Sequence, residues 1–168
     1  FSWGWSEKNN EKIIPIGMLR GRYFDRAAKA ERSERKFITL VQCDGPKYST
    51  NLWSAPISAK QWAAYLSDQF KFVESLSDVM RESLLIRLLS SDFSEAKIQW
   101  IDKFPDLNFD DGRGDIGELM QQTKLYIVTY NATGLLESLY LNIPTIIFWN
   151  PNHWELRADA EPYYQELS

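Results

Sequence analysis

Cysteine and histidine are almost absent from this sequence, and their scarcity excludes several kinds of chemistry. The 168 residues contain one cysteine, Cys43, and one histidine, His153. An intrachain disulfide is therefore excluded, and so are a zinc site of cysteines and histidines and any catalysis that needs two histidines. Cys43 stands in an apolar run, so we expect a buried small residue rather than a nucleophile.

Long hydrophobic runs and an excess of positive charge are also missing. No apolar stretch reaches the roughly 20 residues needed to cross a bilayer, and no signal peptide opens the sequence. The net charge of −4 gives no reason to expect nucleic acid as a partner. We therefore expect a cytoplasmic protein in a reducing compartment, which could still associate peripherally with the inner face of the membrane.

Two features indicate a piece of a longer protein. The sequence starts at Phe1 without a methionine, and it stops inside a helix-like segment, Glu155 to Leu167. The length itself fits one domain with a sizeable core. Aromatic residues are abundant, with seven Trp, eight Tyr and nine Phe, so some of them could line a site for a base or a sugar while others pack the core.

The first 36 residues differ in character from the rest. Residues 12–16 form a short apolar run that could be an edge strand, because Pro15 cannot donate to a central ladder. Residues 20–36 are the most charged stretch, which favours an exposed helix or solvated linker over a patch that binds anionic lipid or phosphate. We therefore divide the chain into an N-terminal strand with a charged linker, residues 1–36, and a domain over residues 37–168.

From residue 37 onward, apolar runs typical of buried strands alternate with helical patterns. The predicted strands cover residues 37–43, 84–89, 104–109, 125–130 and 143–149, and the predicted helices cover 58–82 with Ser58 as N-cap, 94–103, 115–122 and 135–139. This alternation predicts an α/β fold, a Rossmann-like three-layer sandwich with a mostly parallel sheet. Ligands of such sheets bind outside the carboxyl ends of the strands. That rule selects the loops at 44–52, 90–94, 110–115, 130–134 and 149–155.

The turn after the predicted strand at 125–130 is the strongest candidate site. Asn131, Thr133 and Gly134 stand where a helix begins, and a helix N-terminus offers free N–H groups and a positive dipole end. A diphosphate can bind there without a basic side chain. Asn131 or Thr133 could instead simply cap the helix. Gly134 favours binding, because capping does not call for a glycine that costs about 1 kcal/mol relative to alanine.

Glu137 lies one helical turn beyond this candidate site. Helical side chains lean toward the N-terminus, so its carboxylate should point back over Thr133 and Gly134. There it could accept two hydrogen bonds from the hydroxyls of a ribose. The alternative is a favourable interaction of the acid with the helix dipole, worth about 0.3–1 kcal/mol. The residues alone leave both interpretations open.

Polar residues also gather in the loop after the first buried strand, at Gly45, Lys47, Ser49, Thr50 and Asn51. The small hydroxylated side chains could contact a phosphate, and the lysine could neutralise it. The loop is neither a Walker A motif nor a GxGxxG motif, so an ATPase or a dinucleotide-binding domain gains no support. An ordinary polar loop explains the same residues equally well.

Aromatic and polar residues are concentrated in the segment after the last predicted strand, at the edge of the sheet where we expect a ligand to bind. They are Trp149, Asn150, Asn152, His153, Trp154 and Glu155. A sugar could stack on Trp149 or Trp154, and His153 is a weak candidate for a general base because no residue is found to orient it. Alternatively, Asn152 caps a helix with Glu155 three residues later, which resembles a capping box.

Arg87 lies among leucines in the predicted strand at 84–89. A buried arginine must be paired or must reach the edge of the sheet. It could therefore contact a phosphate of a bound ligand, or it could meet a structural carboxylate, which we slightly favour.

Taken together, these residues resemble the C-terminal, donor-binding half of the GT-B glycosyltransferases. The matching segments are Asn131-Ala132-Thr133-Gly134, Glu137 and Asn142-Ile143-Pro144. The chain is also similar to a bacterial family of transferases of surface-polysaccharide clusters. That similarity rests on Trp3-Gly4-Trp5, Pro46-Lys47-Tyr48, Tyr130-Asn131-Ala132-Thr133 and the run from Phe148 to Arg157.

The resemblance implies a nucleotide diphosphate sugar as the ligand, and needs neither a metal nor a cofactor. It places the diphosphate at Thr133, Gly134 and the 45–51 loop, the ribose at Glu137, the base near residues 109–116, and the donor sugar near Asn150 and Glu155. One departure is the absence of the His-Pro that follows the basic residue in some relatives, since Leu88-Leu89-Ser90 follow Arg87 here.

A second departure is the absence of an acceptor domain. GT-B enzymes usually take their catalytic base from the N-terminal half, so we expect the N-terminal domain of the same protein as a partner and no activity from this chain alone. The expected reaction moves the sugar to a glycan or lipid-linked acceptor in surface-polysaccharide synthesis. A non-hydrolysing nucleotide-sugar epimerase and a non-catalytic α/β protein-interaction module are the alternatives, because fold analogy does not prove function.

Overall fold

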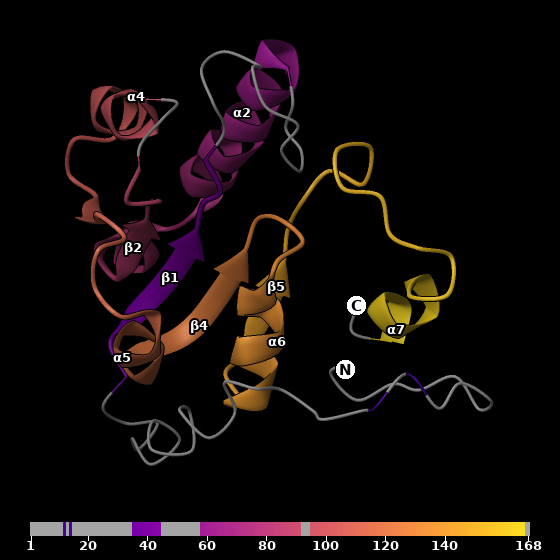
Figure 1. Cartoon of the computed structure of the whole chain (residues 1–168). Helices are drawn as coiled ribbons and strands as arrows, with labels where there is room; N and C mark the ends of the chain where they lie inside the picture. Colours follow the sequence, from indigo (N-terminus) through magenta and orange to yellow (C-terminus); the bar gives the residue numbers. More distant parts are fainter. Residues whose placement is uncertain (1–11, 13, 15–34, 45–57, 92–94, 167–168) are drawn as a thin grey trace.

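The computed structural model describes residues 12, 14, 35–44, 58–91 and 95–166, and Figure 1 shows how their elements are arranged. The strand predicted at 12–16 and the charged segment at 20–36 lie almost entirely outside these residues. The division of the chain at residue 36 therefore stays a prediction.

Five parallel strands form the centre of the domain, in the order β3-β2-β1-β4-β5. They are β1 (Phe37–Val41), β2 (Leu84–Arg87), β3 (Asn108–Asp110), β4 (Thr123–Val128) and β5 (Thr145–Ile147). This is the Rossmann-like α/β fold that the alternating pattern predicts. In the register of the central strands, Val41 pairs with Arg87 on one side and with Val128 on the other. The carboxyl ends of β2, β1 and β4 therefore lie in line.

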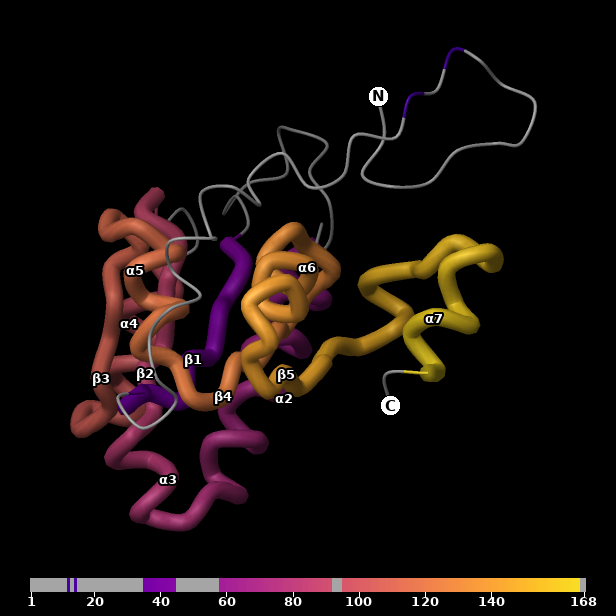
Figure 2. Tube along the Cα trace, turned by 90° about the horizontal axis from the view of Figure 1, so that it is seen from below, coloured from indigo at the N-terminus to yellow at the C-terminus, as the bar shows by residue number. Residues whose placement is uncertain are grey.

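Helices cover both faces of this sheet. They are α2 (Ala59–Ser75), α3 (Asp78–Glu82), α4 (Ala96–Lys103), α5 (Ile116–Gln121) and α6 (Thr133–Tyr140), and α7 (Glu161–Glu166) lies beyond β5. Alternation along β4 separates the two layers. Ile127 packs in a core with residues of α2 and α4, whereas Tyr126 and Val128 pack in a second core with residues of α5 and α6. Figure 2 shows α5 and α6 on one side of the strands and α3 on the other.

The helix predicted over residues 58–82 is two helices. Ser58 caps α2 as expected, and a full capping box forms with Gln61. Leu76 then takes an extended conformation, with φ −75° and ψ 146°, and ends α2. Arg81 stabilises the break, because its guanidinium donates to the carbonyl oxygens of Val73 at 3.1 Å and Glu74 at 2.7 Å. These are carbonyls of the last helical turn, where the regular helical hydrogen bonds run out, and the Val73 oxygen also accepts from the N–H of Leu76 at 3.1 Å.

The remaining differences from the prediction concern where elements begin and end. The strand predicted at 104–109 is the short β3 at 108–110, and the helix predicted after residue 155 begins only at Glu161. No helix in the described ranges combines the length and the apolar character needed to cross a membrane.

Candidate functional site

The topology places a switch point between β1 and β4. These neighbouring strands run in the same direction, but the helix that follows β1 covers one face of the sheet and the helix that follows β4 covers the other. In open α/β sheets, ligands bind outside the carboxyl ends of the strands at such a switch point. The loops that meet there are the one after Val41 and the one after Val128. The second of them is the turn that the sequence singles out.

A buried chain of hydrogen bonds lies at this switch point. The Cys43 N–H donates to the Tyr65 hydroxyl oxygen at 2.9 Å, and the Tyr65 and Thr129 hydroxyl oxygens lie 2.6 Å apart. Thr129 in turn donates to the carbonyl oxygen of Val41, which leaves Tyr65 to donate to Thr129. Burial raises the pKa of Tyr65 well above its ordinary value, so its hydroxyl keeps its proton. The network ties α2 to both central strands.

Burial also raises the pKa of the Cys43 thiol, from its ordinary value of 9.0 to about 12. Below pH 9 the thiol is protonated in the folded and unfolded states, so its contribution to stability is fully present. As the pH rises from about 9 toward 12, only the unfolded state loses this proton. The free energy of unfolding should then fall by up to about 1.4 kcal/mol per pH unit through this group. Urea unfolding across this range measures the slope.

Cys43→Ala is the matched control for this pH dependence. Burial also raises the pKa of Tyr130, from its ordinary value of 10.0 to about 12. Its unfolded form begins to lose its proton near pH 10, so tyrosines add to the slope from there upward. We therefore expect the variant to lose most of the slope just above pH 9. An unchanged slope in that region would contradict a buried, protonated thiol.

The turn between β4 and α6 carries Asn131, Thr133 and Gly134. Ala132 is the N-cap residue of α6, and no side chain makes a capping hydrogen bond there. The alternative that Asn131 or Thr133 caps the helix is therefore wrong, because the Asn131 amide turns to α7 and accepts a hydrogen bond from the Tyr164 hydroxyl at 3.3 Å. Thr133 is exposed in the first turn. The start of α6 thus lies at the switch point without a side-chain cap.

The packing of α6 on β4 explains why a glycine occupies position 134, which the sequence alone did not reveal. A β-carbon built on Gly134 would lie 2.7 Å from the hydroxyl oxygen of Tyr126. Tyr126 is fully buried under α6, so its ring has little room to move away. Glycine therefore lets the helix close down on β4. Its predicted role in admitting a ligand to the backbone stays a prediction.

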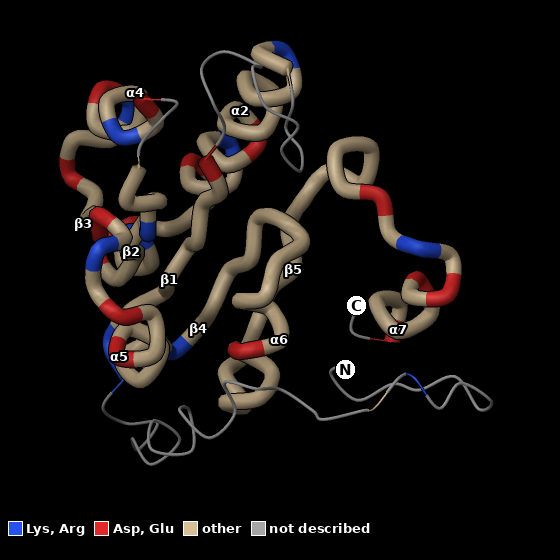
Figure 3. The backbone as a smooth tube through the Cα atoms, in the orientation of Figure 1, with Lys and Arg blue, Asp and Glu red and all other residues tan. Residues whose placement is uncertain are grey.

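Glu137 is buried, with 2% of its surface exposed. Burial raises the pKa values of Tyr126 and Tyr130, and the negative charge of Glu137 adds to this effect. A ribose that hydrogen-bonds to Glu137 would have to displace groups that now cover it. Glu137 is the acidic residue of α6, and Figure 3 shows the red acidic band on this helix and no charged band in the turn before it.

The segment after β5 is a turn organised by Asn150. The Asn150 side-chain oxygen accepts from the N–H of Asn152 at 2.9 Å, and its backbone oxygen accepts from the N–H of His153 at 2.9 Å. The predicted capping box of Asn152 and Glu155 is wrong, because no helix begins there and the Asn152 N–H is used inside this turn. Glu155 is exposed.

Trp154 belongs to the hydrophobic core. It is 6% exposed, and its ring centroid lies 5.3 Å from that of Tyr65 on α2. A sugar therefore has no free face of this ring to stack on. Trp149 is only half-buried, and its ring meets Tyr164 of α7 edge-on at 5.8 Å.

A cavity of about 340 Å³ lies between α2 and the segment after β5. Residues Tyr65, Asp68 and Gln69 line it from α2, and residues 148–151 and 153 line it from the other side. Three of the predicted site residues, Trp149, Asn150 and His153, therefore come together here. Glu155 is not among the lining residues.

The sequence analysis did not predict the α2 residues of this cavity as site residues. Trp62, Tyr65, Leu66, Gln69 and Val73 recur at helical spacing, which is typical of a core-facing helix. Gln69 is the polar exception in that stripe, and a polar residue at a core position was the available signal.

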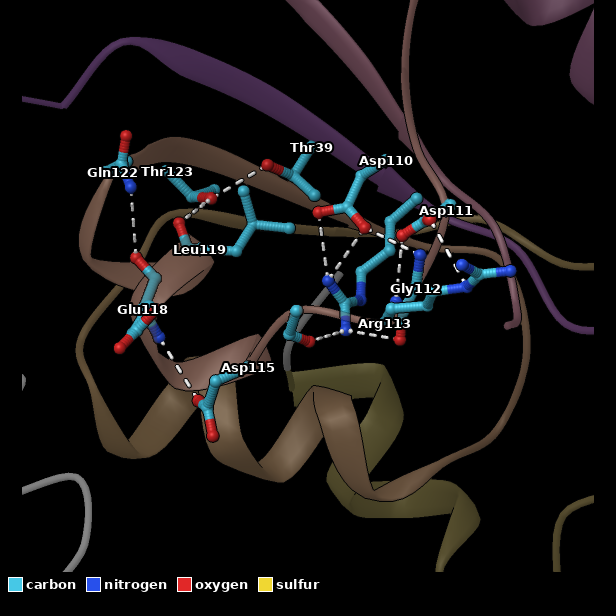
Figure 4. A network of polar contacts seen from close by, with 12 residues as sticks. Thr39, Asp110, Asp111, Gly112, Arg113, Asp115, Glu118, Leu119, Gln122 and Thr123 are labelled. Atoms are coloured by element: carbon cyan, nitrogen blue, oxygen red, sulfur yellow. Dashed lines mark hydrogen bonds and ion pairs between the residues drawn. The ribbon is translucent and has the colours of Figure 1, made fainter. Parts of the chain in front are cut away.

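Arg87 meets a structural carboxylate, the alternative that we favoured. Its guanidinium lies 3.0 Å from a carboxylate oxygen of Asp110 at the end of β3. It also donates to the carbonyl oxygens of Gly112 at 3.3 Å and Gly114 at 2.7 Å. Figure 4 shows the loop residues Asp110, Gly112 and Asp115. Asp115 also caps α5, because its carboxylate accepts from the N–H groups of Gly117 and Glu118. The loop at 110–115 is thus held at the carboxyl edge of the sheet, where the resemblance places the base.

The loop residues Gly45, Lys47, Ser49, Thr50 and Asn51 lie outside the described residues, so their predicted phosphate contacts stay predictions. Among the residues that the structure describes, no cluster of three or more His, Cys, Asp or Glu side chains could hold a metal ion.

Comparison with known proteins identifies a family. Neither curated proteins nor solved structures match the chain significantly. Among protein families, the LIC12162 family transferase matches residues 1–168, which is the whole chain. The chain therefore belongs to the LIC12162 family of transferases.

Proposed function

We propose that this chain is the donor-binding domain of a GT-B-type glycosyltransferase. The full protein would move a sugar from a nucleotide diphosphate sugar to a glycan or lipid-linked acceptor in surface-polysaccharide synthesis. The observation that carries the proposal is the start of α6, which has no side-chain cap, follows β4 at the switch point, and carries Glu137 one turn later. Membership of a transferase family supports group transfer as the chemistry.

The charge distribution supports anion binding through the backbone. No lysine or arginine occurs between Leu125 and Leu156, so a diphosphate at this site would rely on amide N–H groups and the helix dipole. The same groups would stabilise the negative charge that develops on the leaving diphosphate during transfer. Lys47, outside the described residues, would add the one basic contact from the loop after β1.

Glu137 would hold the ribose, and the catalytic base would come from the N-terminal domain of the same protein. His153 remains the weaker candidate for that base. A lipid-linked acceptor would bring the protein to the inner face of the membrane, as a peripheral association.

Calorimetric titration with UDP, CDP, GDP and dTDP tests this function directly. We expect one nucleotide to bind, and Glu137→Gln to weaken its binding at least tenfold. Each hydrogen bond to a charged group contributes about 1.5–3 kcal/mol, and about 1.4 kcal/mol corresponds to a tenfold change. Glutamine keeps the size of the buried side chain, so the fold should tolerate the change.

Glu82→Gln is the matched control for the loss of charge. Glu82 ends α3 just before β2 begins, so it lies at the amino edge of the sheet, opposite the proposed site. This variant should bind the nucleotide like the original chain. If no nucleotide binds at millimolar concentration, the donor-binding function is contradicted and a protein-interaction module is favoured.

A further inference from the structure

The strand β5 is an open edge of the sheet in the described part of the chain. Its only neighbour there is β4, to which the Pro144 oxygen and the Phe148 N–H each make a hydrogen bond of 2.9 Å. In a parallel pair, alternate residues turn their N–H and C=O groups toward the neighbouring strand. The backbone groups of Thr145 and Ile147 therefore point away from β4. Among the described residues, none of these four groups has a hydrogen-bond partner.

A groove of about 730 Å³ lies along this edge, between β5 and α7. Its walls include all three residues of β5 on one side and Glu161, Tyr164 and Gln165 of α7 on the other. A strand residue takes up about 3.3 Å along the chain, 4.8 Å between strands and 10 Å across the sheet, or roughly 160 Å³. The groove therefore has room for about four or five residues of one extended strand.

The chemistry of this edge favours pairing with an apolar segment. Natural proteins commonly place charged side chains on exposed edge strands to prevent pairing. β5 is short, but it has no charged residue, and Ile146 in its middle is 39% exposed. Glu161 is the only charged residue among those that line the groove. An extended uncharged segment can add to such an edge through its main chain.

The chain itself contains a segment of this kind at residues 12–16. It reads Lys12-Ile13-Ile14-Pro15-Ile16 and is the run that the sequence predicts as an edge strand; only its first and third residues are described. Ile14 is 52% exposed and belongs to no strand of the structure, so its side chain lacks cover. Residues 17–34 separate this segment from the start of the domain. They exceed the dozen or so residues that a connection between parallel strands needs.

We propose that residues 12–16 dock in this groove as a sixth strand, parallel to β5. The N–H of Ile14 donates to the Thr145 oxygen, and the Ile14 oxygen accepts from the N–H of Ile147. The residues two before and two after Ile14 pair the two remaining groups of the edge. The docked segment also covers the exposed side chains on both strands. This inference goes beyond the proposed function and does not depend on whether a nucleotide binds.

A disulfide tests the docking in the 168-residue chain. In the proposed register Ile14 lies opposite Ile146, and neighbouring strands are about 4.8 Å apart, within the roughly 4.4–6.8 Å between Cα atoms that a disulfide needs. We expect Ile14→Cys with Ile146→Cys to cross-link under mild oxidation, as measured by non-reducing electrophoresis. Ile13→Cys with Ile146→Cys is the matched control, because residue 13 would face the other side of the sheet. Cys43 is buried, so it does not compete.

Each outcome of this experiment decides something. A cross-link within one chain in the first pair alone supports the proposal. A disulfide between two chains would show that the strand comes from a second copy, which would overturn docking within one chain. Equal cross-linking in the two pairs would indicate chance encounters of a free segment. That result, or the absence of any cross-link, would also overturn the proposal.

Amide hydrogen exchange gives a second test, in which two proline variants are compared. Ile14→Pro removes the N–H that donates to β5, whereas Ile13→Pro removes an N–H that points away from it, as the natural Pro15 does. We expect the N–H of Ile147 to be protected in the original chain and in Ile13→Pro, and to exchange at least tenfold faster in Ile14→Pro. Equal exchange rates in all three chains would overturn the pairing.

Discussion

Replacing Trp100 by alanine is expected to lower the free energy of unfolding by about 3–5 kcal/mol. Trp100 on α4 is completely buried. Its ring meets Phe70 edge-on at a centroid distance of 4.7 Å and lies 5.8 Å from Phe104. Its indole N–H also donates to the side-chain oxygen of Gln42. The substitution removes this packing, leaves a cavity, and deprives Gln42 of its partner. Denaturation by urea at neutral pH measures the loss.

Two further variants separate the packing from the hydrogen bond. Trp100→Phe keeps an aromatic ring but leaves the Gln42 oxygen unpaired, in a side chain whose nitrogen already has no partner among the described residues. Adding Gln42→Leu should recover part of the loss, because removing both partners of a buried hydrogen bond costs less than removing one. If Trp100→Ala costs less than about 1 kcal/mol, which is ordinary for point mutants, α4 does not close the core as described.

The centre of the sheet could be predicted from the sequence because the strands β1, β2 and β4 are largely buried. Continuous apolar runs such as Phe37–Val41 cannot be exposed on either side, so they indicate parallel strands between helical layers. The break between α2 and α3 could not be predicted in this way. No glycine or proline marks the break. The side chain that caps the end of α2 is Arg81, which belongs to the next helix.

The candidate site shows the same division between local and tertiary effects. The turn at Asn131 and Gly134 was found because small polar residues between a strand and a helix are a local pattern. The burial of Trp154 depends on Tyr65, far away in the sequence. Gln69 likewise lines the cavity only because α2 lies against the segment after β5. A sequence read along the chain does not show such pairs.

Replacing Arg87 by methionine is expected to lower the free energy of unfolding by about 2–4 kcal/mol. The guanidinium nitrogen Nη1 donates to both carboxylate oxygens of Asp110, at 3.1 and 3.0 Å, and Nη2 donates to the carbonyls of Gly112 and Gly114. Methionine fills much of the space but leaves all these acceptors without the donor. The cost stays below that of a fully buried pair because the Asp110 side chain is 22% exposed. Urea denaturation gives the value.

The loss should be larger than that in a matched arginine variant. Arg81 also donates to two carbonyls, but its ion pair with Asp78 at 4.0 Å is exposed, so Arg81→Met should cost only about 1 kcal/mol. Arg87→Lys should not restore stability, because an ammonium cannot reproduce the planar set of donors. Since Gly112 has a φ of +73° and no room for a β-carbon beside the Leu88 carbonyl, the loop has one geometry that the arginine holds. Equal costs for Arg87→Met and Arg81→Met would show that the loop at 110–115 keeps its place without the guanidinium.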